Sequence, residues 1–86
     1  MTVTNYKSID RGAVVASFDL ELDSGMVVYG MKLMNGKNGR WVGFPERPYQ
    51  QNGETKYAKI IGIPNRERSD KFRDLVLSVL DGQDDS

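Results

Sequence analysis

The 86-residue sequence contains no cysteine and no histidine. Without cysteine it can form no disulfide, offer no thiolate to a metal and use no thiol nucleophile. Without histidine it also lacks the commonest metal ligand and the commonest general base. We therefore expect a protein that is not an enzyme and that has no cofactor, no bound metal and no small-molecule substrate.

Long hydrophobic runs are missing as well. No stretch of the sequence approaches the roughly 18 apolar residues that a membrane helix needs. Residues 1–10 also lack the basic segment and apolar core of a secretion signal. We expect a cytoplasmic protein with no membrane partner.

The composition is ordinary for a folded protein, with 38% hydrophobic and 28% charged residues. A chain this short hides only about two-thirds of its unfolded surface, so its core is thin. We expect a single domain over residues 1–81, followed by an acidic, frayed tail over residues 82–86. Pairing with a second copy would enlarge the core, so we also expect a homodimer.

Twelve basic and twelve acidic residues cancel overall, but they are unevenly distributed along the chain. Residues 1–31 have a net charge of −2, whereas residues 32–73 hold ten basic residues against four acidic ones, a net charge of +6. Residues 74–86 add four acidic residues and no basic one. A basic block suits a phosphate backbone, because each neutralised phosphate releases counterions. The alternative is ordinary surface solvation, since charge segregated in sequence need not be segregated in space.

Residues 12–22 alternate between apolar and polar side chains, which predicts a half-buried strand. The turn residues Asp23-Ser24-Gly25 follow, and residues 26–34 predict a second strand, so the two should form a hairpin. Residues 36–39 (Gly-Lys-Asn-Gly) predict a tight turn into a third strand, residues 40–44.

Pro45 and Pro48 should end the third strand, because proline lacks the donor that a strand ladder needs. The polar residues 49–53 then form a loop or the tip of a long hairpin, and residues 55–63 predict a fourth strand. Residues 3–7 could add a short edge strand.

The hydrophobic period changes to that of a helix after Ser69. Asn65 or Ser69 can cap the start of this helix, and Gly82 is placed where a left-handed C-terminal residue is expected. The elements together predict an α+β fold: a curved antiparallel sheet of four to five strands with one C-terminal amphipathic helix. The predicted apolar stripe consists of Phe72, Leu75, Val76, Val79 and Leu80.

The segment Gly36-Lys37-Asn38-Gly39-Arg40-Trp41-Val42-Gly43-Phe44-Pro45 combines a G-x-N-G turn, an aromatic-aliphatic strand and a proline. This segment resembles the signature of the SpoVG family. The resemblance extends over residues 12–80. Upstream it includes Ala16-Ser17 and Met26-Val27-Val28-Tyr29, and downstream it includes Ile63-Pro64-Asn65 and Lys71-Phe72-Arg73-Asp74-Leu75-Val76-Leu77.

The resemblance implies a small dimeric protein that binds DNA or RNA and modulates gene expression or cell division in bacteria, without catalysis or a cofactor. The basic loop that the family carries after the proline is here Glu46-Arg47-Pro48, so only Arg47 matches it. A more distant, purely architectural resemblance is to positive-cofactor-type single-stranded-DNA-binding coactivators, which favours a single-stranded ligand.

The candidate contacts to nucleic acid are the cations of the basic block and its tryptophan. Trp41 either packs into the core or, if Val42 and Phe44 point inward, lies outside where it can stack on a base. A second hypothesis is a protein-interaction adaptor that uses its sheet edge or helix face and binds no nucleic acid. The predicted nucleic-acid-binding residues are Lys37, Arg40, Trp41, Arg47, Lys56, Lys59, Arg66, Arg68 and Lys71.

Asp19, Glu21 and Asp23 alternate on one strand face and could in principle bind Mg²⁺. A solvated face is the simpler interpretation, because no histidine or lysine base lies near in sequence. Such acids can also protect an exposed sheet edge from aggregation. We predict no metal site and no catalytic residue.

Overall fold

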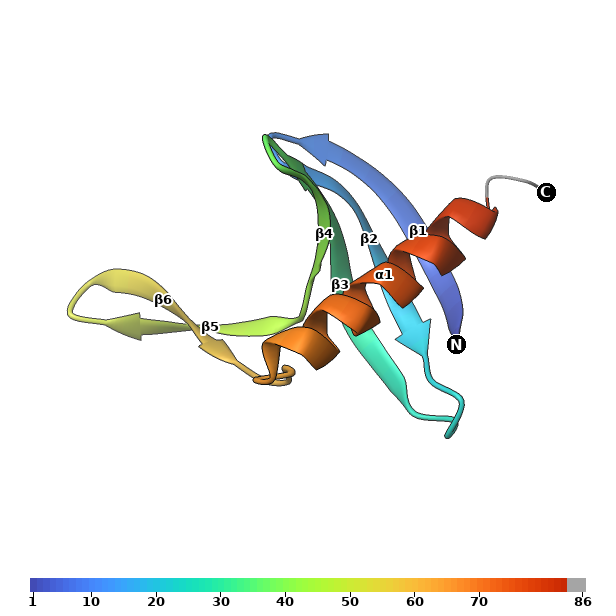
Figure 1. Ribbon diagram of the computed structural model, residues 1–86. Coiled ribbons are helices and arrows are strands. Elements are labelled where there is room, and N and C mark those ends of the chain that lie inside the picture. The colour runs from blue at the N-terminus through green and yellow to red at the C-terminus, as the bar shows by residue number, and fades with distance from the viewer. Residues whose placement is uncertain (84–86) are drawn as a thin grey trace.

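The computed structural model describes residues 1–83, which form six strands and one helix (Figure 1). Strands β1–β4 make an antiparallel sheet in that order, and β5 and β6 make a separate two-stranded sheet. The α+β prediction is therefore confirmed. The elements are β1 (Thr2–Arg11), β2 (Val14–Glu21), β3 (Val27–Gly36), β4 (Gly39–Gly43), β5 (Glu46–Gln51), β6 (Glu54–Lys59) and α1 (Arg66–Gln83).

The alternation in β2 decides which face of the large sheet is buried. Ala16, Phe18 and Leu20 are almost fully buried, whereas the residues between them lie on the opposite face. The register pairs these three residues with Leu33, Met31 and Val28 of β3, respectively. Because partners in a ladder share a face, one continuous apolar layer forms. We refer to this side as the inner face and to the opposite side as the outer face.

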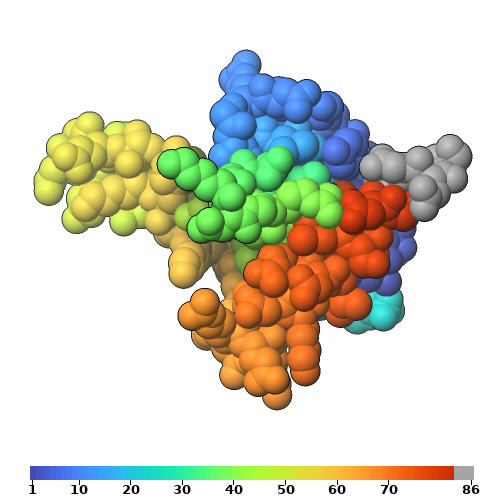
Figure 2. Space-filling view, turned by 45° about the horizontal axis from the view of Figure 1, so that its top comes forward, coloured from blue at the N-terminus to red at the C-terminus, as the bar shows by residue number. Residues whose placement is uncertain are grey.

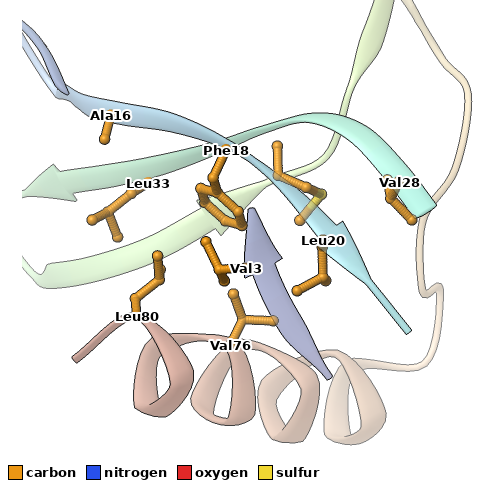
Figure 3. Close-up of a cluster of buried hydrophobic side chains, with 9 residues drawn as sticks. Val3, Ala16, Phe18, Leu20, Val28, Leu33, Val76 and Leu80 are labelled. Atoms are coloured by element: carbon orange, nitrogen blue, oxygen red, sulfur yellow. The ribbon is translucent and has the colours of Figure 1, made fainter. Parts of the chain in front are cut away.

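Helix α1 covers the inner face and crosses the sheet diagonally (Figures 1 and 3). It lies against both edge strands of the four-stranded sheet, β1 and β4. Val76 and Leu80 enter the core beside Val3. Burying a side chain of this size contributes about 1.5–3 kcal/mol.

The predicted helix stripe is correct except at one position. Val76 and Leu80 are buried, and Phe72 and Val79 pack partly against the core, but Leu75 is 58% exposed. Leu77, on the other side of Val76, packs partly against the core instead, so the buried stripe is rotated away from Leu75. Within residues 1–83, no helix is long and apolar enough to cross a membrane.

Asn65 caps the start of α1. Its side-chain oxygen accepts a 2.9 Å hydrogen bond from the backbone N–H of Arg68, so the helix begins at Arg66 rather than after Ser69. The expectation of a left-handed Gly82 is wrong, because the helix continues through Gly82 to Gln83. Glycine permits a left-handed conformation without requiring it. Residues 84–86 of the predicted tail lie outside the described residues.

Two strands differ in length from their prediction. The edge strand β1 covers ten residues rather than residues 3–7, and β6 ends at Lys59 rather than at Ile63. Lys59 pairs with Glu46, the first residue of β5, so the ladder has no partner for the residues after it.

The chain between Glu46 and Gln51 forms strand β5, with Pro48 inside it, so Pro48 does not end a strand. Both strands of a two-stranded ladder are edges, which is where proline is tolerated. Of the two possibilities for residues 49–53, the tip of a hairpin is correct. The β5–β6 hairpin turns at Asn52 and Gly53, and every residue of both strands is exposed. Neither strand lies against another element, and Figure 2 shows this hairpin standing away from the body.

Asp19 joins irregularities in two neighbouring strands. Its carboxylate accepts a 2.8 Å hydrogen bond from the side chain of Asn5 in β1 and a 3.1 Å bond from the backbone N–H of Gly30 in β3. Asn5 and Gly30 both have positive φ, and both lie where the register shifts. Because β2 is an internal strand, its acidic residues do not protect an edge, and Asp19 instead fixes two β-bulges.

Acid should weaken the contribution of Asp19 to stability. The hydrogen bond from Asn5, and then that from Gly30, hold the pKa of Asp19 below its ordinary value of 3.8. A carboxyl with a lowered folded-state pKa stabilises the fold above its unfolded pKa, and this stabilisation is lost as the pH falls through the folded value. We expect Asp19→Ala to lower the urea midpoint at neutral pH, and the difference from wild type to shrink in acid below 3.8.

Glu21→Ala on the same strand is the control for charge removal, because the exposed Glu21 side chain makes no hydrogen bond that the structure describes within residues 1–83. The variant should leave the urea midpoint nearly unchanged. If the difference in urea midpoint between Asp19→Ala and wild type stayed constant with pH, this role of the Asp19 carboxylate would be contradicted.

Candidate nucleic-acid interface

The position of Trp41 follows from the turn before it. Gly36 pairs with Gly39 across a two-residue loop, and this register places Trp41 opposite Met34 and Val42 opposite Leu33. Leu33 belongs to the core, so Val42 faces inward and Trp41 lies on the outer face with 42% of its surface exposed. The core alternative for Trp41 is wrong, because Val42 takes the inward position.

Gly36 leaves room for the Trp41 ring. A Cβ atom at Gly36 would lie 2.9 Å from Cζ3 and 3.1 Å from Cη2 of Trp41, which is too close for either atom to stay in place. The turn glycine therefore also lets the indole lie flat along the outer face.

A groove of about 460 Å³ lies between the outer face and the base of the hairpin. Trp41 lines it from β4 and Tyr57 from β6, so two aromatic side chains come from strands of different sheets. Lys32 supplies a cation from β3, and Glu46 supplies a carboxylate from β5. The other lining residues are Val14, Gly30, Met34, Gly43, Phe44 and Pro45.

A second hollow of about 260 Å³ adjoins the groove, since Phe44 and Glu46 line both. Lys59 of β6 and Ser69 of α1 both line it. Beside it, the rings of Phe44 and of Phe72 in α1 are stacked, with centroids 5.4 Å apart, and join the helix to the segment between β4 and β5.

The first turns of α1 carry three of the predicted cations. All three, Arg66, Arg68 and Lys71, are exposed. Lys71 also forms an ion pair with Glu67, with 3.9 Å between Nζ and Oε1. The N-terminal end of a helix carries a partial positive charge, which adds to that of the side chains. These cations belong to the same helix start as Ser69, which lines the second hollow.

The remaining predicted cations lie elsewhere. Arg47 and Lys56 share the hairpin face opposite to that of Tyr57 and Lys59, because neighbouring residues of a strand alternate. Lys37 is exposed in the turn between β3 and β4. Arg40 faces inward and forms two 2.8 Å hydrogen bonds with Asp81 of α1, which hold the pKa of the Asp81 carboxyl below its ordinary value.

The comparison with known proteins finds a relative that matches most of the chain. The chain is 32% identical over 79 residues to the "Putative septation protein SpoVG" of Archaeoglobus fulgidus, and the match covers 92% of this chain and 89% of that protein. The chain belongs to the SpoVG family. No family model and no solved structure matches it.

The segment that carries the resemblance to the SpoVG family also builds the groove. The turn at residues 36–39 sets the register of Trp41, and Pro45 turns the chain from β4 into β5. The segment that resembles the SpoVG signature therefore has a structural role: it lines the groove and turns the chain from β4 into the hairpin.

Of the residues that line the groove of this SpoVG-family chain, the sequence prediction named Trp41. The polar side chains that it omitted are Lys32, Glu46 and Tyr57. The position of Lys32 could have been predicted from the two-residue turn. The turn pairs Met34 with Trp41, and Lys32, two residues from Met34 on the same strand, lies on the face of Trp41. Glu46 had no such signal, since β5 was not predicted as a strand. Tyr57 lay within a predicted strand, but no pattern placed that strand beside Trp41.

Within residues 1–83, no group of three or more acidic residues comes together in a way that could hold a metal ion. Asp19 is engaged with Asn5 and Gly30, as described above. The alternating acids of β2 thus have a structural explanation at Asp19.

Proposed function

We propose that this SpoVG-family protein binds nucleic acid, preferably single-stranded, and acts in the cytoplasm as a regulator of transcription, replication or division. The observation that carries the proposal is the groove in which Trp41 and Tyr57 lie beside Lys32. The name of the Archaeoglobus relative, a septation protein, fits a role in division.

A single strand fits this groove better than a duplex does. The bases of a duplex are stacked on one another, so their faces are not available to a protein side chain. Bases of a single strand can splay out and stack on aromatic rings, which contributes about 1–3 kcal/mol per base. The exposed rings of Trp41 and Tyr57 offer such platforms.

The cations around the second hollow suit the phosphates of the same strand. Lys59 lines this hollow, and Arg66 and Arg68 extend from the adjacent helix start. Phosphate contacts position a nucleic acid without reading its sequence. Each one also releases counterions, so the affinity should fall steeply with salt.

Fluorescence anisotropy with labelled single-stranded and duplex oligonucleotides at several salt concentrations tests the proposal. We expect the double variant Arg66→Ala/Arg68→Ala to weaken binding to every sequence and to reduce the salt slope for a single strand by about 1.4, which is about 0.7 per lost phosphate contact. The control is Lys7→Ala on β1, a cation that lines neither the groove nor the second hollow, and it should leave the salt slope unchanged.

A parallel double variant, Arg47→Ala/Lys56→Ala, tests the opposite face of the hairpin. A loss of salt slope there as well would extend the interface around the hairpin. Absence of binding to any oligonucleotide at low salt would refute the proposal.

We further propose that the protein is a homodimer and that the β5–β6 hairpin pairs the two copies. A lone two-stranded hairpin is marginally stable in water, and both of its edges carry backbone groups that a second copy could pair. We expect light scattering at micromolar concentration to give a dimer, and a variant with Asn-Gly in place of residues 49–56 to give a monomer. A monomeric wild type would refute the dimer, and a shortened variant that stays dimeric would refute pairing through the hairpin.

The adaptor hypothesis remains the second candidate, because the same exposed hairpin is a possible edge for β-strand addition by another protein. It predicts salt-tolerant binding to a protein and none to oligonucleotides, so the anisotropy experiment separates the two functions.

A further inference from the structure

Glu46 is an unexpected side chain in a groove for nucleic acid. Among the residues that line this groove in the described part of the chain, it is the only acidic one. It lies where the groove and the second hollow meet, since it lines both. A carboxylate at this point repels phosphates, so a bound strand must present something else to it.

The carboxylate of Glu46 is also available for a ligand. Within residues 1–83 the structure gives its side chain neither a hydrogen bond nor an ion pair, although Lys59 is its partner across the hairpin. Its side chain is exposed, and Trp41 and Tyr57 line the same groove. The groove therefore combines two acceptor oxygens with two aromatic side chains.

An ionised carboxylate accepts hydrogen bonds and donates none, so its best partner has two adjacent donors. The Watson–Crick edge of an unpaired base is free for such contacts. Guanine has two neighbouring donors there, N1–H and the N2 amino group. Adenine and cytosine have only the amino group on that edge, and thymine and uracil have one N–H flanked by carbonyl oxygens that a carboxylate repels.

We propose that Glu46 makes the groove selective for an unpaired guanine, whose N1–H and N2 amino group donate to its two carboxylate oxygens while the base stacks against Trp41 or Tyr57. This inference rests on the proposed function, because it concerns which base the same groove accepts. Glu46 thus acts as a specificity-determining residue, and the surrounding cations act on phosphates regardless of sequence.

The test uses labelled oligothymidylate nine nucleotides long and versions with one central guanine, inosine, adenine or cytosine. A well-placed bidentate pair discriminates by about 1–3 kcal/mol, so we expect the guanine oligonucleotide to bind about tenfold more tightly than oligothymidylate. Inosine lacks the N2 amino group and should fall between them. Glu46→Gln should bring the guanine oligonucleotide to the level of oligothymidylate.

Glu54→Gln is the matched control, because it removes the same charge from the same hairpin at its turn, outside the groove. It should keep the preference for guanine. Two results would overturn the guanine selection and leave nucleic-acid binding intact. One is equal affinity of the wild type for all five oligonucleotides, and the other is a Glu46→Gln variant whose affinity rises equally for all of them. No binding of any oligonucleotide would overturn the proposed function, and the guanine selection with it.

Discussion

Trp41→Ala is expected to weaken the binding of a single-stranded oligonucleotide by about fivefold to 150-fold, because stacking on one aromatic ring contributes about 1–3 kcal/mol per base. Trp41 lies on the outer face, away from the core, so its removal should cost the fold little. Trp41→Phe retains a ring and should recover most of the affinity.

The chain has a single tryptophan, so its intrinsic fluorescence reports on this position alone. We expect the emission of the wild type to be quenched when an unlabelled oligonucleotide binds. Tyr29→Ala is the control: Tyr29 is 69% exposed on β3 and is not among the groove residues. Unchanged emission at saturation, or equal losses of affinity for Trp41→Ala and Tyr29→Ala, would place the bound strand elsewhere.

Leu80→Ala is expected to lower the free energy of unfolding by about 2–5 kcal/mol, because it removes a buried side chain and leaves a cavity. Leu80 is 5% exposed and packs in the core formed by the sheet and α1. A domain of this size has a total stability of about 5–15 kcal/mol, so the variant should be close to unfolding. Urea denaturation followed by circular dichroism measures the change.

Leu75→Ala is the matched control on the same helix. Leu75 is 58% exposed, and a surface substitution typically changes the stability by about 0.5 kcal/mol or less. Both substitutions have the same chemistry and nearly the same helix propensity change, so only burial distinguishes them. Equal destabilisation by the two would mean that a surface in the native assembly covers Leu75.

Local patterns predicted most of the large sheet. The alternation around Phe18 identified β2 and its buried face, and the glycine-rich turn at residues 36–39 identified the β3–β4 hairpin. These predictions succeeded because the period of a strand and the geometry of a two-residue turn are properties of a few adjacent residues. The helix was predicted for the same reason, with Asn65 and Ser69 left open as caps.

The candidate site was predicted only in part. Trp41 was singled out, but its side of the sheet remained open, because alternation shows that Trp41 and Val42 lie on opposite faces without showing which face the helix covers. The cations were treated as one block, yet Arg40 pairs with Asp81, and Arg47 and Lys56 lie on the hairpin face away from Tyr57.

The sequence by itself determined the strand periods, the turns, the amphipathic helix and the resemblance to the SpoVG family. Only the tertiary structure decided that Trp41 faces outward, that β5 and β6 leave the large sheet as a hairpin, and that Glu46 and Tyr57 meet Trp41 in one groove. These features depend on where α1 packs and on how the chain turns at Pro45. They join residues distant in sequence, and no short-range pattern encodes such contacts.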